Sequence, residues 1–344
     1  MTTTRWISAA LALGALGCGT EGPTGPSVGL TSGSCNGGFE SVADTALAAI
    51  NRAEGWSAGV LVEVAGTRRC EVFFGAFDRG TTVAVASAAK WLSAATIMAV
   101  VDRGLISLDD SVGRFLPGVT GVPATIRLRQ LLSHTSGLPA YDNCMFDANL
   151  ALQTCARTIL AGQAIAGPGI GFHYGGASYT VAGAMVEVAT GNSWAAVFDT
   201  YLAQPLQLAA TTYGPGTNPM LSEGGVVTTL GDYGRFLGML AAGGTSGGGR
   251  VLSADAIREL RTPRTTGLPI LGSPRGALGY ALGSWVDAEA GGLATLSTSP
   301  GSRGFVPLID WSRRIVVIVE AFDYLDRVWP LFQAVWSEVD RKAP

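Results

Sequence analysis

Two side chains three residues apart, Ser87 and Lys90, have the types and the spacing of a nucleophile and its base. On a helix, residues at this spacing lie on one face, so the two side chains are expected within hydrogen-bonding range. A serine hydroxyl attacks a carbonyl carbon effectively only when a neighbouring base takes its proton. A helix start also offers free backbone N–H groups to a developing oxyanion. The pair therefore predicts acyl transfer through a covalent serine intermediate.

Lysine is scarce in this chain, which makes Lys90 informative. Of 23 basic residues, only Lys90 and Lys342 are lysines. Lys90 lies in residues 80–101, a mostly apolar run with no other charged residue. Burial there would disfavour the charged ammonium and leave an amine that can act as a base. The alternative is that Ser87 caps a helix and Lys90 extends to the surface, and the spacing alone does not separate the two.

Three further segments support the catalytic interpretation. Residues 131–139 are L-L-S-H-T-S-G-L-P, residues 172–179 are F-H-Y-G-G-A-S-Y, and residues 299–305 are S-P-G-S-R-G-F. Together with V-A-V-A-S-A-A-K-W-L at 83–92, they resemble the motifs of serine β-lactamases and penicillin-binding proteins, in particular class C β-lactamase-like hydrolases and related esterases. The resemblance covers nearly the whole chain after its N-terminal segment.

The resemblance implies roles for individual residues. Tyr174 takes the place of the family's catalytic tyrosine and would share the base function with Lys90 as a coupled pair. The oxyanion would lie between the backbone N–H groups of Ser87 and Ser302. The candidate oxyanion and substrate-binding residues are Ser302, Gly301, Ser299, Tyr141 and Gly176.

The sequence departs from the family pattern at two of these positions. Gly176 stands where the tyrosine motif usually ends in Asn, and Ser299 stands where the strand motif usually begins with Lys or His. The first change removes an amide and the second a cation, so recognition of a substrate carboxylate is expected to be weakened. Arg303 has the same parity as Ser299 on an extended strand and is a candidate source of replacement charge.

Other nucleophile arrangements fit the sequence less well. A Ser-His-Asp triad would need His134 or His173, the only histidines in the chain. The resemblance implies that His134 buttresses the wall of the site, while His173 should point away from Tyr174 and make a local hydrogen bond. Two G-x-S-x-G matches, at 55–59 and 244–248, do not connect a strand to a helix as a nucleophile elbow does.

Three functions remain open at this stage. The altered motifs favour a carboxylesterase or small-amide hydrolase. A β-lactamase or D-Ala-D-Ala peptidase is the second, and a non-catalytic cell-wall or ligand sensor is the third. Neither a metal nor an organic cofactor is expected. The net charge of −3 and the lack of a Lys/Arg block argue against a nucleic-acid partner.

Strand-like segments at both ends of the chain, with helices between them, predict an α+β fold. One antiparallel sheet would form from both ends and carry flanking helices, with an all-helical insertion, and the resemblance implies a β-lactamase/transpeptidase-like architecture. The α/β part is expected at 39–105 plus 250–344, and the mainly helical part at 106–249. The expected helices are 40–53, 87–103, 126–132, 148–161, 178–190, 193–204, 229–242 and 323–339.

The N-terminal segment has the pattern of an export signal. Arg5 precedes an apolar stretch that ends at Cys18 and is too short to span a bilayer, so 1–17 is predicted to be a signal peptide and 18–38 a flexible tether. Residues 15–18, A-L-G-C, resemble a lipoprotein processing site. The protein is therefore expected to be exported, either as a periplasmic or outer-membrane lipoprotein anchored through Cys18 or as a secreted protein.

Removal of Cys18 leaves four cysteines, an even number for an oxidising compartment. Local pairing predicts disulfides between Cys35 and Cys70 and between Cys144 and Cys155. The alternative is four buried thiols acting as small apolar side chains.

Overall fold

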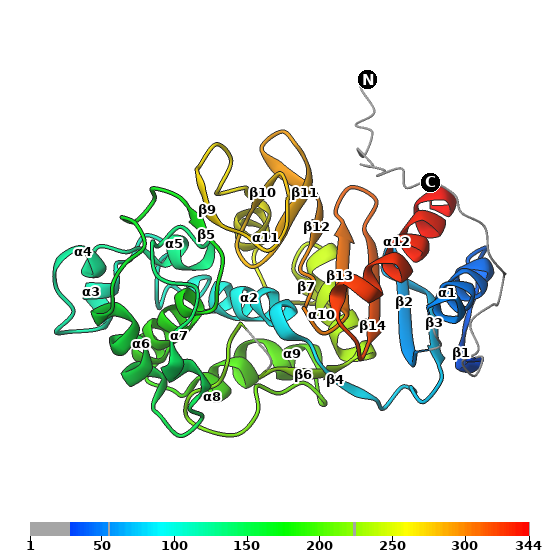
Figure 1. The fold of residues 1–344 in the computed structure, drawn as a ribbon, viewed down its shortest axis with the longest axis horizontal. Coiled ribbons are helices and arrows are strands. Elements are labelled where there is room, and N and C mark those ends of the chain that lie inside the picture. Colours follow the sequence, from blue (N-terminus) through cyan, green and yellow to red (C-terminus); the bar gives the residue numbers. More distant parts are fainter. Residues whose placement is uncertain (1–27, 54–55, 223–224, 344) are drawn as a thin grey trace, which may run out of the picture.

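The computed structural model describes residues 28–53, 56–222 and 225–343. The main strands are β1 (Leu30–Cys35), β2 (Ala58–Val64), β3 (Thr67–Phe74), β10 (Gly279–Tyr280), β11 (Trp285–Ala290), β12 (Leu293–Thr298), β13 (Phe305–Asp310) and β14 (Ile315–Ala321). They form one antiparallel eight-stranded sheet in the order β1-β3-β2-β14-β13-β12-β11-β10. Strands from the two ends of the chain lie side by side in it, blue β2 next to orange β14 (Figure 1). The predicted α+β architecture is confirmed.

Helices cover both faces of the sheet. On one face α1 (Glu40–Arg52) packs against α12 (Leu325–Lys342). On the other, α2 (Ala89–Val101), α10 (Leu230–Ala241) and α11 (Ala254–Arg261) join the larger core. Strands covered on both sides have no solvated face, which explains the near-continuous apolar sequences of β13 and β14, where every residue is buried.

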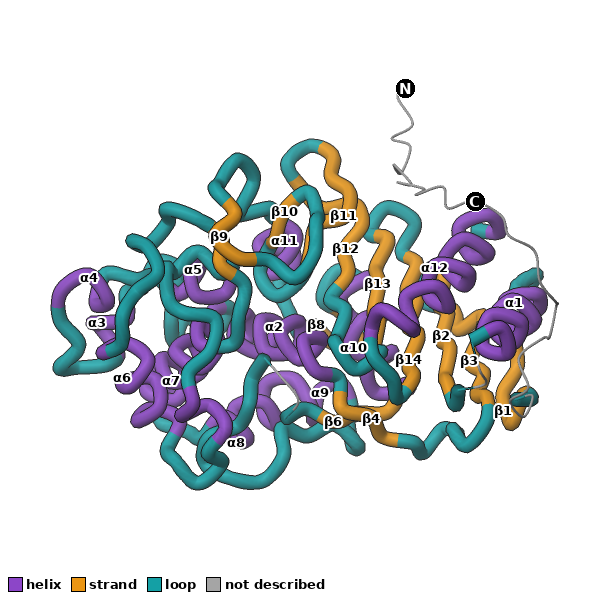
Figure 2. Tube along the Cα trace, in the orientation of Figure 1, coloured by secondary structure: helices purple, strands orange, loops and turns teal. Residues whose placement is uncertain are grey.

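The middle of the chain is mainly helical, and Figure 2 shows its helices and long loops on the left, beside the strands. Its elements are α3 (Val112–Phe115), α4 (Gly121–Ala124), α5 (Leu128–Leu132), α6 (Leu152–Ala161), α7 (Ala177–Thr190), α8 (Trp194–Phe198) and α9 (Gln204–Leu206), with short turns η2 (Asn143–Phe146) and η3 (Asp199–Ala203). Three pairs of short strands lie outside the main sheet: β4 (Thr82–Ala84) with β6 (Val227–Thr229), β5 (Phe172–His173) with β9 (Ile270–Gly272), and β7 (Thr245–Ser246) with β8 (Gly249–Arg250).

Three sequence-based expectations need correction. The tether predicted at 18–38 is wrong for Leu30–Cys35, which pairs with β3 as an edge strand, and structure begins before Phe39. The expected boundary at 249 is too late, because α10 packs on β14 and β2 and so belongs with the sheet. Helix α11 was not expected, although Ser253 caps it by accepting a hydrogen bond from the Ala256 N–H. The predicted signal peptide and Cys18 lie outside the described residues.

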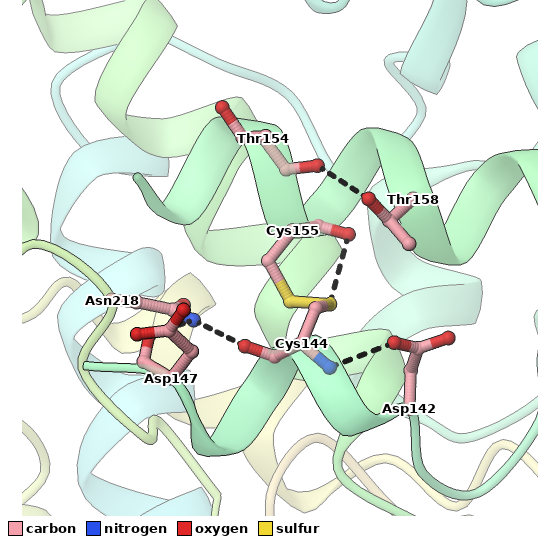
Figure 3. Close-up of a disulfide and its surroundings, with 7 residues drawn as sticks. All are labelled: Asp142, Cys144, Asp147, Thr154, Cys155, Thr158 and Asn218. Carbon is pink, nitrogen blue, oxygen red and sulfur yellow. Dashed lines mark hydrogen bonds between the residues drawn. A yellow bond between two sulfur atoms is a disulfide. The ribbon is translucent and has the colours of Figure 1, made fainter. Parts of the chain in front are cut away.

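Both expected disulfides form. Cys35 of β1 pairs with Cys70 of β3, and Cys144 pairs with Cys155 of α6. Figure 3 shows the second pair beside Asn218, whose side-chain amide donates to the carbonyls of Cys144 and Asp147 at 2.7 and 3.1 Å. This disulfide therefore fixes the turn that follows Tyr141 to the helical part. Among the described residues, no helix has the length and apolar character needed to cross a bilayer.

Candidate active site

Ser87 lies in η1 (Ala86–Ala88), a short turn that leads directly into α2. The residue before it, Ala86, has a φ of 46°, a left-handed conformation that is unfavourable for a residue with a side chain. Strain of this kind persists where the surroundings fix the backbone, and it is common at functional sites. Here it presents Ser87, which is half-buried, at the mouth of a cavity.

Lys90 lies beneath Ser87 on the first turn of α2. Its side chain is fully buried, and Nζ donates hydrogen bonds to Ser87 Oγ at 3.0 Å and to the Ser222 carbonyl at 2.7 Å. One turn further, the Ser93 hydroxyl donates to the Leu221 carbonyl at 2.5 Å, which holds the same segment against α2. The helix thus brings the predicted nucleophile and base into direct contact, and the backbone at 221–222 orients the amine.

Tyr174 forms the wall opposite Ser87 and follows β5. Its N–H donates to the Gly272 carbonyl at 2.9 Å, and its ring is stacked on Trp285 with centroids 5.0 Å apart. Lys90 Nζ lies 4.5 Å from the centroid of the same ring. The tyrosine and the lysine are therefore adjacent, as a coupled base requires.

His134 supports Tyr174 from behind. It is buried, its ring centroid lies 4.6 Å from that of Tyr174, and its carbonyl accepts the His173 N–H. Burial, and to a smaller extent the nearby Lys90 charge, holds the pKa of His134 well below its ordinary value, so the ring is neutral. The His173 ring makes a hydrogen bond with the Leu138 carbonyl at 3.1 Å.

The end of β12 closes the other side of the cavity. Ser299 is buried, and its hydroxyl donates to the Gly283 carbonyl at 3.2 Å. A Cβ on Gly301 would lie 2.1 Å from the Val85 carbonyl oxygen, so the strand approaches the nucleophile turn backbone to backbone. The Ser302 N–H donates to no other described residue, which leaves it available for an oxyanion.

These elements enclose a cavity of about 360 Å³. It is lined by Ser87, Tyr141, Tyr174, Gly272, Ser273, Pro274, Arg275, Trp285, Pro300, Ser302 and Leu325. Tyr141 lies at the rim with half of its surface exposed. Gly176, Ser299 and Gly301 do not line the cavity, and their contribution is to backbone geometry. Within the described part of the chain, no group of three His, Cys, Asp or Glu side chains is placed to hold a metal ion.

Sequence reasoning missed Trp285 and the loop that carries Arg275. The Arg275 guanidinium donates to Asp287 Oδ1 at 2.5 Å and to Thr298 Oγ1 at 2.9 Å, and it lies over the Trp285 ring. Since Gly272 of the same loop holds Tyr174, this loop connects the tyrosine wall to the end of β12. The sequence spacing of these residues does not predict that the loop contacts Tyr174 and the end of β12.

Arg303 does not occupy the place that strand parity suggested. Residues 302–304 form a turn, and β13 begins only at Phe305, so the alternation does not extend back to Arg303. Its side chain is exposed and lines a second cavity, and it does not line the cavity that contains Ser87.

Comparison with known proteins finds a matching family model and several sequence relatives. The family model for Beta-lactamase matches residues 45–319. Penicillin-binding protein 4 of Amycolatopsis lactamdurans is 32% identical over 237 residues, which cover 56% of this chain and 61% of that protein. The matches to protein flp of Staphylococcus aureus and penicillin-binding protein 4* of Bacillus subtilis span only 28% and 29% of those proteins.

Two solved structures share the fold. A beta-lactamase-like protein from Bacteroides dorei is 30% identical with a TM-score of 0.79, covering 90% of this chain and 99% of that one. A family VIII carboxylesterase is 18% identical with a TM-score of 0.75, covering 89% and 99%. The second likeness concerns the fold alone.

Proposed function

Because the chain belongs to the beta-lactamase family of serine hydrolases, we propose that it hydrolyses carboxylic esters through an acyl-enzyme on Ser87. The observation that carries the proposal is the 3.0 Å contact between Ser87 Oγ, which lines the cavity, and the buried Lys90 Nζ. A preference for esters over β-lactams follows from Ser299, whose hydroxyl is turned to the Gly283 carbonyl and leaves no cation at the start of the strand motif.

The first step is attack of Ser87 Oγ on the ester carbonyl carbon. The hydroxyl proton passes to the Lys90 and Tyr174 pair, and the carbonyl oxygen gains negative charge between the N–H groups of Ser87 and Ser302. The C–O bond to the alcohol then breaks. Tyr174, which borders the cavity, returns the proton to the leaving alkoxide, and the serine ester remains.

Water completes the cycle. The same pair removes a proton from a water molecule, which attacks the acyl carbon, and Ser87 leaves with that proton as the carboxylic acid is released. The Ser222 carbonyl accepts one Lys90 N–H at 2.7 Å, which holds the amine beside Ser87 Oγ. A pH–rate profile reports Lys90 and Tyr174 as a pair.

The test compares substrates of three classes. Purified protein is incubated with p-nitrophenyl butyrate, a chromogenic cephalosporin and a D-Ala-D-Ala peptide, and acylation is followed by peptide mass spectrometry. Ester turnover and a butyryl adduct on the Ser87 peptide are expected. Ser87→Ala should abolish both, whereas Ser246→Ala, in the second G-x-S-x-G match, should keep them.

Each contrary result has a definite meaning. Ester turnover that survives in Ser87→Ala refutes the mechanism. Faster turnover of the cephalosporin or the peptide than of the ester refutes the preference and makes the chain a β-lactamase or a peptidase. A stable adduct without turnover indicates a sensor.

We also propose that the protein is exported, with Cys18 as a lipid anchor. Two disulfides in the described residues support an oxidising compartment, and the A-L-G-C segment at 15–18 supports lipidation. Metabolic labelling with a palmitate analogue should mark the wild type and not Cys18→Ser. Equal labelling of both, or of neither, would exclude the anchor.

A further inference from the structure

A second cavity, of about 410 Å³, adjoins the candidate active site. It is lined by Ser302, Arg303, Phe322, Asp323 and Tyr324. Ser302 also lines the cavity that contains Ser87, and so does Leu325, the residue that follows Tyr324. The two cavities therefore share Ser302, the residue whose N–H is proposed to bind the carbonyl oxygen, as part of their walls.

The wall of this second cavity exposes two aromatic rings. Phe322 and Tyr324 have 67% and 73% of their surfaces exposed, although each is large enough to bury well over 100 Å². Neighbouring aromatic side chains left in water are typical of sites where an apolar or aromatic group binds. An aryl group on the substrate would cover both rings.

The segment that carries the rings is fixed relative to Ser302. The Leu325 N–H donates to the Ser302 carbonyl at 3.0 Å, and the Ala321 N–H donates to the Gly304 carbonyl at 3.1 Å. A Cβ on Gly304, whose φ is 83°, would lie 2.8 Å from the Asp323 carbonyl oxygen. The turn and the aromatic segment thus form one preorganised wall, which lowers the entropy cost of binding.

The charges at this wall leave a net cation. Asp323 is compensated, because its carboxylate pairs with Arg327 at 3.1 Å and accepts the Tyr324 N–H at 2.7 Å. Arg303 makes no ion pair or side-chain hydrogen bond with any described residue. Arg275, the arginine of the neighbouring cavity, is neutralised by Asp287 at 2.5 Å. An anionic substrate group is therefore attracted to Arg303 and not to Arg275.

We propose that this second cavity is a substrate subsite for an aryl group that carries a carboxylate. Phe322 and Tyr324 would bind the ring, and the Arg303 guanidinium would bind the carboxylate through paired N–H···O bonds. The inference rests on the proposed ester hydrolysis at Ser87 and names its substrate class: esters with a carboxyaryl group on the acyl or the alcohol side.

Matched ester pairs that differ only in charge test the subsite. On the alcohol side, 4-acetoxybenzoate is compared with 4-acetoxybenzamide. On the acyl side, the 4-nitrophenyl monoester of terephthalic acid is compared with 4-nitrophenyl 4-carbamoylbenzoate. Wild type should prefer the anionic member of at least one pair in kcat/KM. The preference should appear in KM, and it should weaken at high salt because the site is open to solvent.

Substitution of the cation gives the decisive comparison. Arg303→Gln should reduce the anionic-to-neutral ratio of kcat/KM by about 3- to 10-fold, the size expected for a solvent-accessible charge-assisted contact. Arg258→Gln is the matched control, because Arg258 is an exposed arginine on α11, paired with Asp255, and the ratio should not change. The double variant Phe322→Ala, Tyr324→Ala should lower kcat/KM for both aryl members relative to vinyl acetate by roughly 5-fold.

Failure of the subsite is distinguishable from failure of the function. Equal kcat/KM within both pairs, or a ratio that survives in Arg303→Gln, overturns the subsite while ester turnover stands. If wild type hydrolyses no ester, the proposed function fails instead. Equilibrium binding of the amides 4-acetamidobenzoate and 4-acetamidobenzamide then decides the subsite: tighter binding of the anion that is lost in Arg303→Gln supports it, and equal binding overturns it.

Discussion

A buried carboxyl in the sheet makes the stability of this protein depend on pH in an unusual direction. Glu320 of β14 is fully buried, and neither of its carboxyl oxygens has a hydrogen-bond partner among the described residues. Space for it exists because β2 carries Gly59 opposite, where a Cβ would lie 2.6 Å from Oε1. Burial, with a smaller contribution from the charge of Glu71, raises the pKa of Glu320 to about 8.

The sign follows from which state holds the proton more tightly. The ordinary pKa of this group is 4.5, so the folded protein keeps a proton that the unfolded chain has lost at neutral pH. The contribution of Glu320 to stability is fully present below pH 4.5 and decreases as the pH rises toward about 8. Above that pH it no longer changes. Over the window the free energy of unfolding falls by about 1.4 kcal/mol per pH unit, or about 2.5 kcal/mol between pH 5 and pH 7.

Urea unfolding of the wild type and of Glu320→Gln at several pH values tests this. The difference between their unfolding free energies isolates the contribution of Glu320. The amide has nearly the same shape and no proton to lose, so the variant should lack the fall. The difference in unfolding free energy between variant and wild type should grow by about 2.5 kcal/mol from pH 5 to pH 7 in favour of the variant. Glu289→Gln, at an exposed position of β11, should keep the wild-type slope. A difference that stays constant, or changes in the opposite direction, would refute the assignment of a protonated Glu320.

Three more outcomes follow from the geometry. Lys90→Met should lower kcat for p-nitrophenyl butyrate by roughly 10³-fold or more, because the proton of Ser87 loses its acceptor; stopped-flow detection of undiminished acylation would contradict that role. Gly301→Ala should lower kcat/KM by roughly tenfold or more and stability by about 1–3 kcal/mol, since its Cβ would lie 2.1 Å from the Val85 carbonyl oxygen and the strand must retreat from the nucleophile turn. Replacing both Cys144 and Cys155 by Ser should cost about 3 kcal/mol in urea unfolding, given their separation of 11 residues; an unchanged midpoint would show that the bridge adds no stability.

Local sequence signals were sufficient to predict the contact between Ser87 and Lys90, although the catalytic interpretation also needed the distant motif segments. Ser87 and Lys90 meet because a helical turn has a fixed geometry, and the apolar run around Lys90 explains why the lysine is buried without reference to any distant residue. Local sequence also marks β14, because a strand inside a covered sheet has a nearly continuous apolar sequence. Features that depend only on residues close in sequence can therefore be predicted without the structure.

Features created by distant contacts could not be predicted in this way. Trp285 stacks on Tyr174 across 111 residues of sequence, and no periodicity connects them. The strand at Leu30–Cys35 has a polar, Gly- and Ser-containing sequence, and it is ordered by pairing with β3 and by the bridge to Cys70. The prediction that the Arg303 side chain points the same way as Ser299 was wrong because a three-residue turn interrupts the strand. Side chains alternate only within a continuous strand.

The start of the strand motif lacks the positive charge of the family pattern. Where the family has Lys or His at the start of the strand motif, Ser299 is buried and uncharged, Arg275 is neutralised by Asp287, and His134 is neutral. Arg303 lines the second cavity together with the two exposed rings of Phe322 and Tyr324. A β-lactam carries its carboxylate close to the bond that breaks, whereas a carboxyaryl ester places it a ring's width away. In the proposed subsite, a carboxylate one ring away from the ester carbonyl would reach Arg303, whereas a β-lactam carboxylate would meet no cation at Ser299.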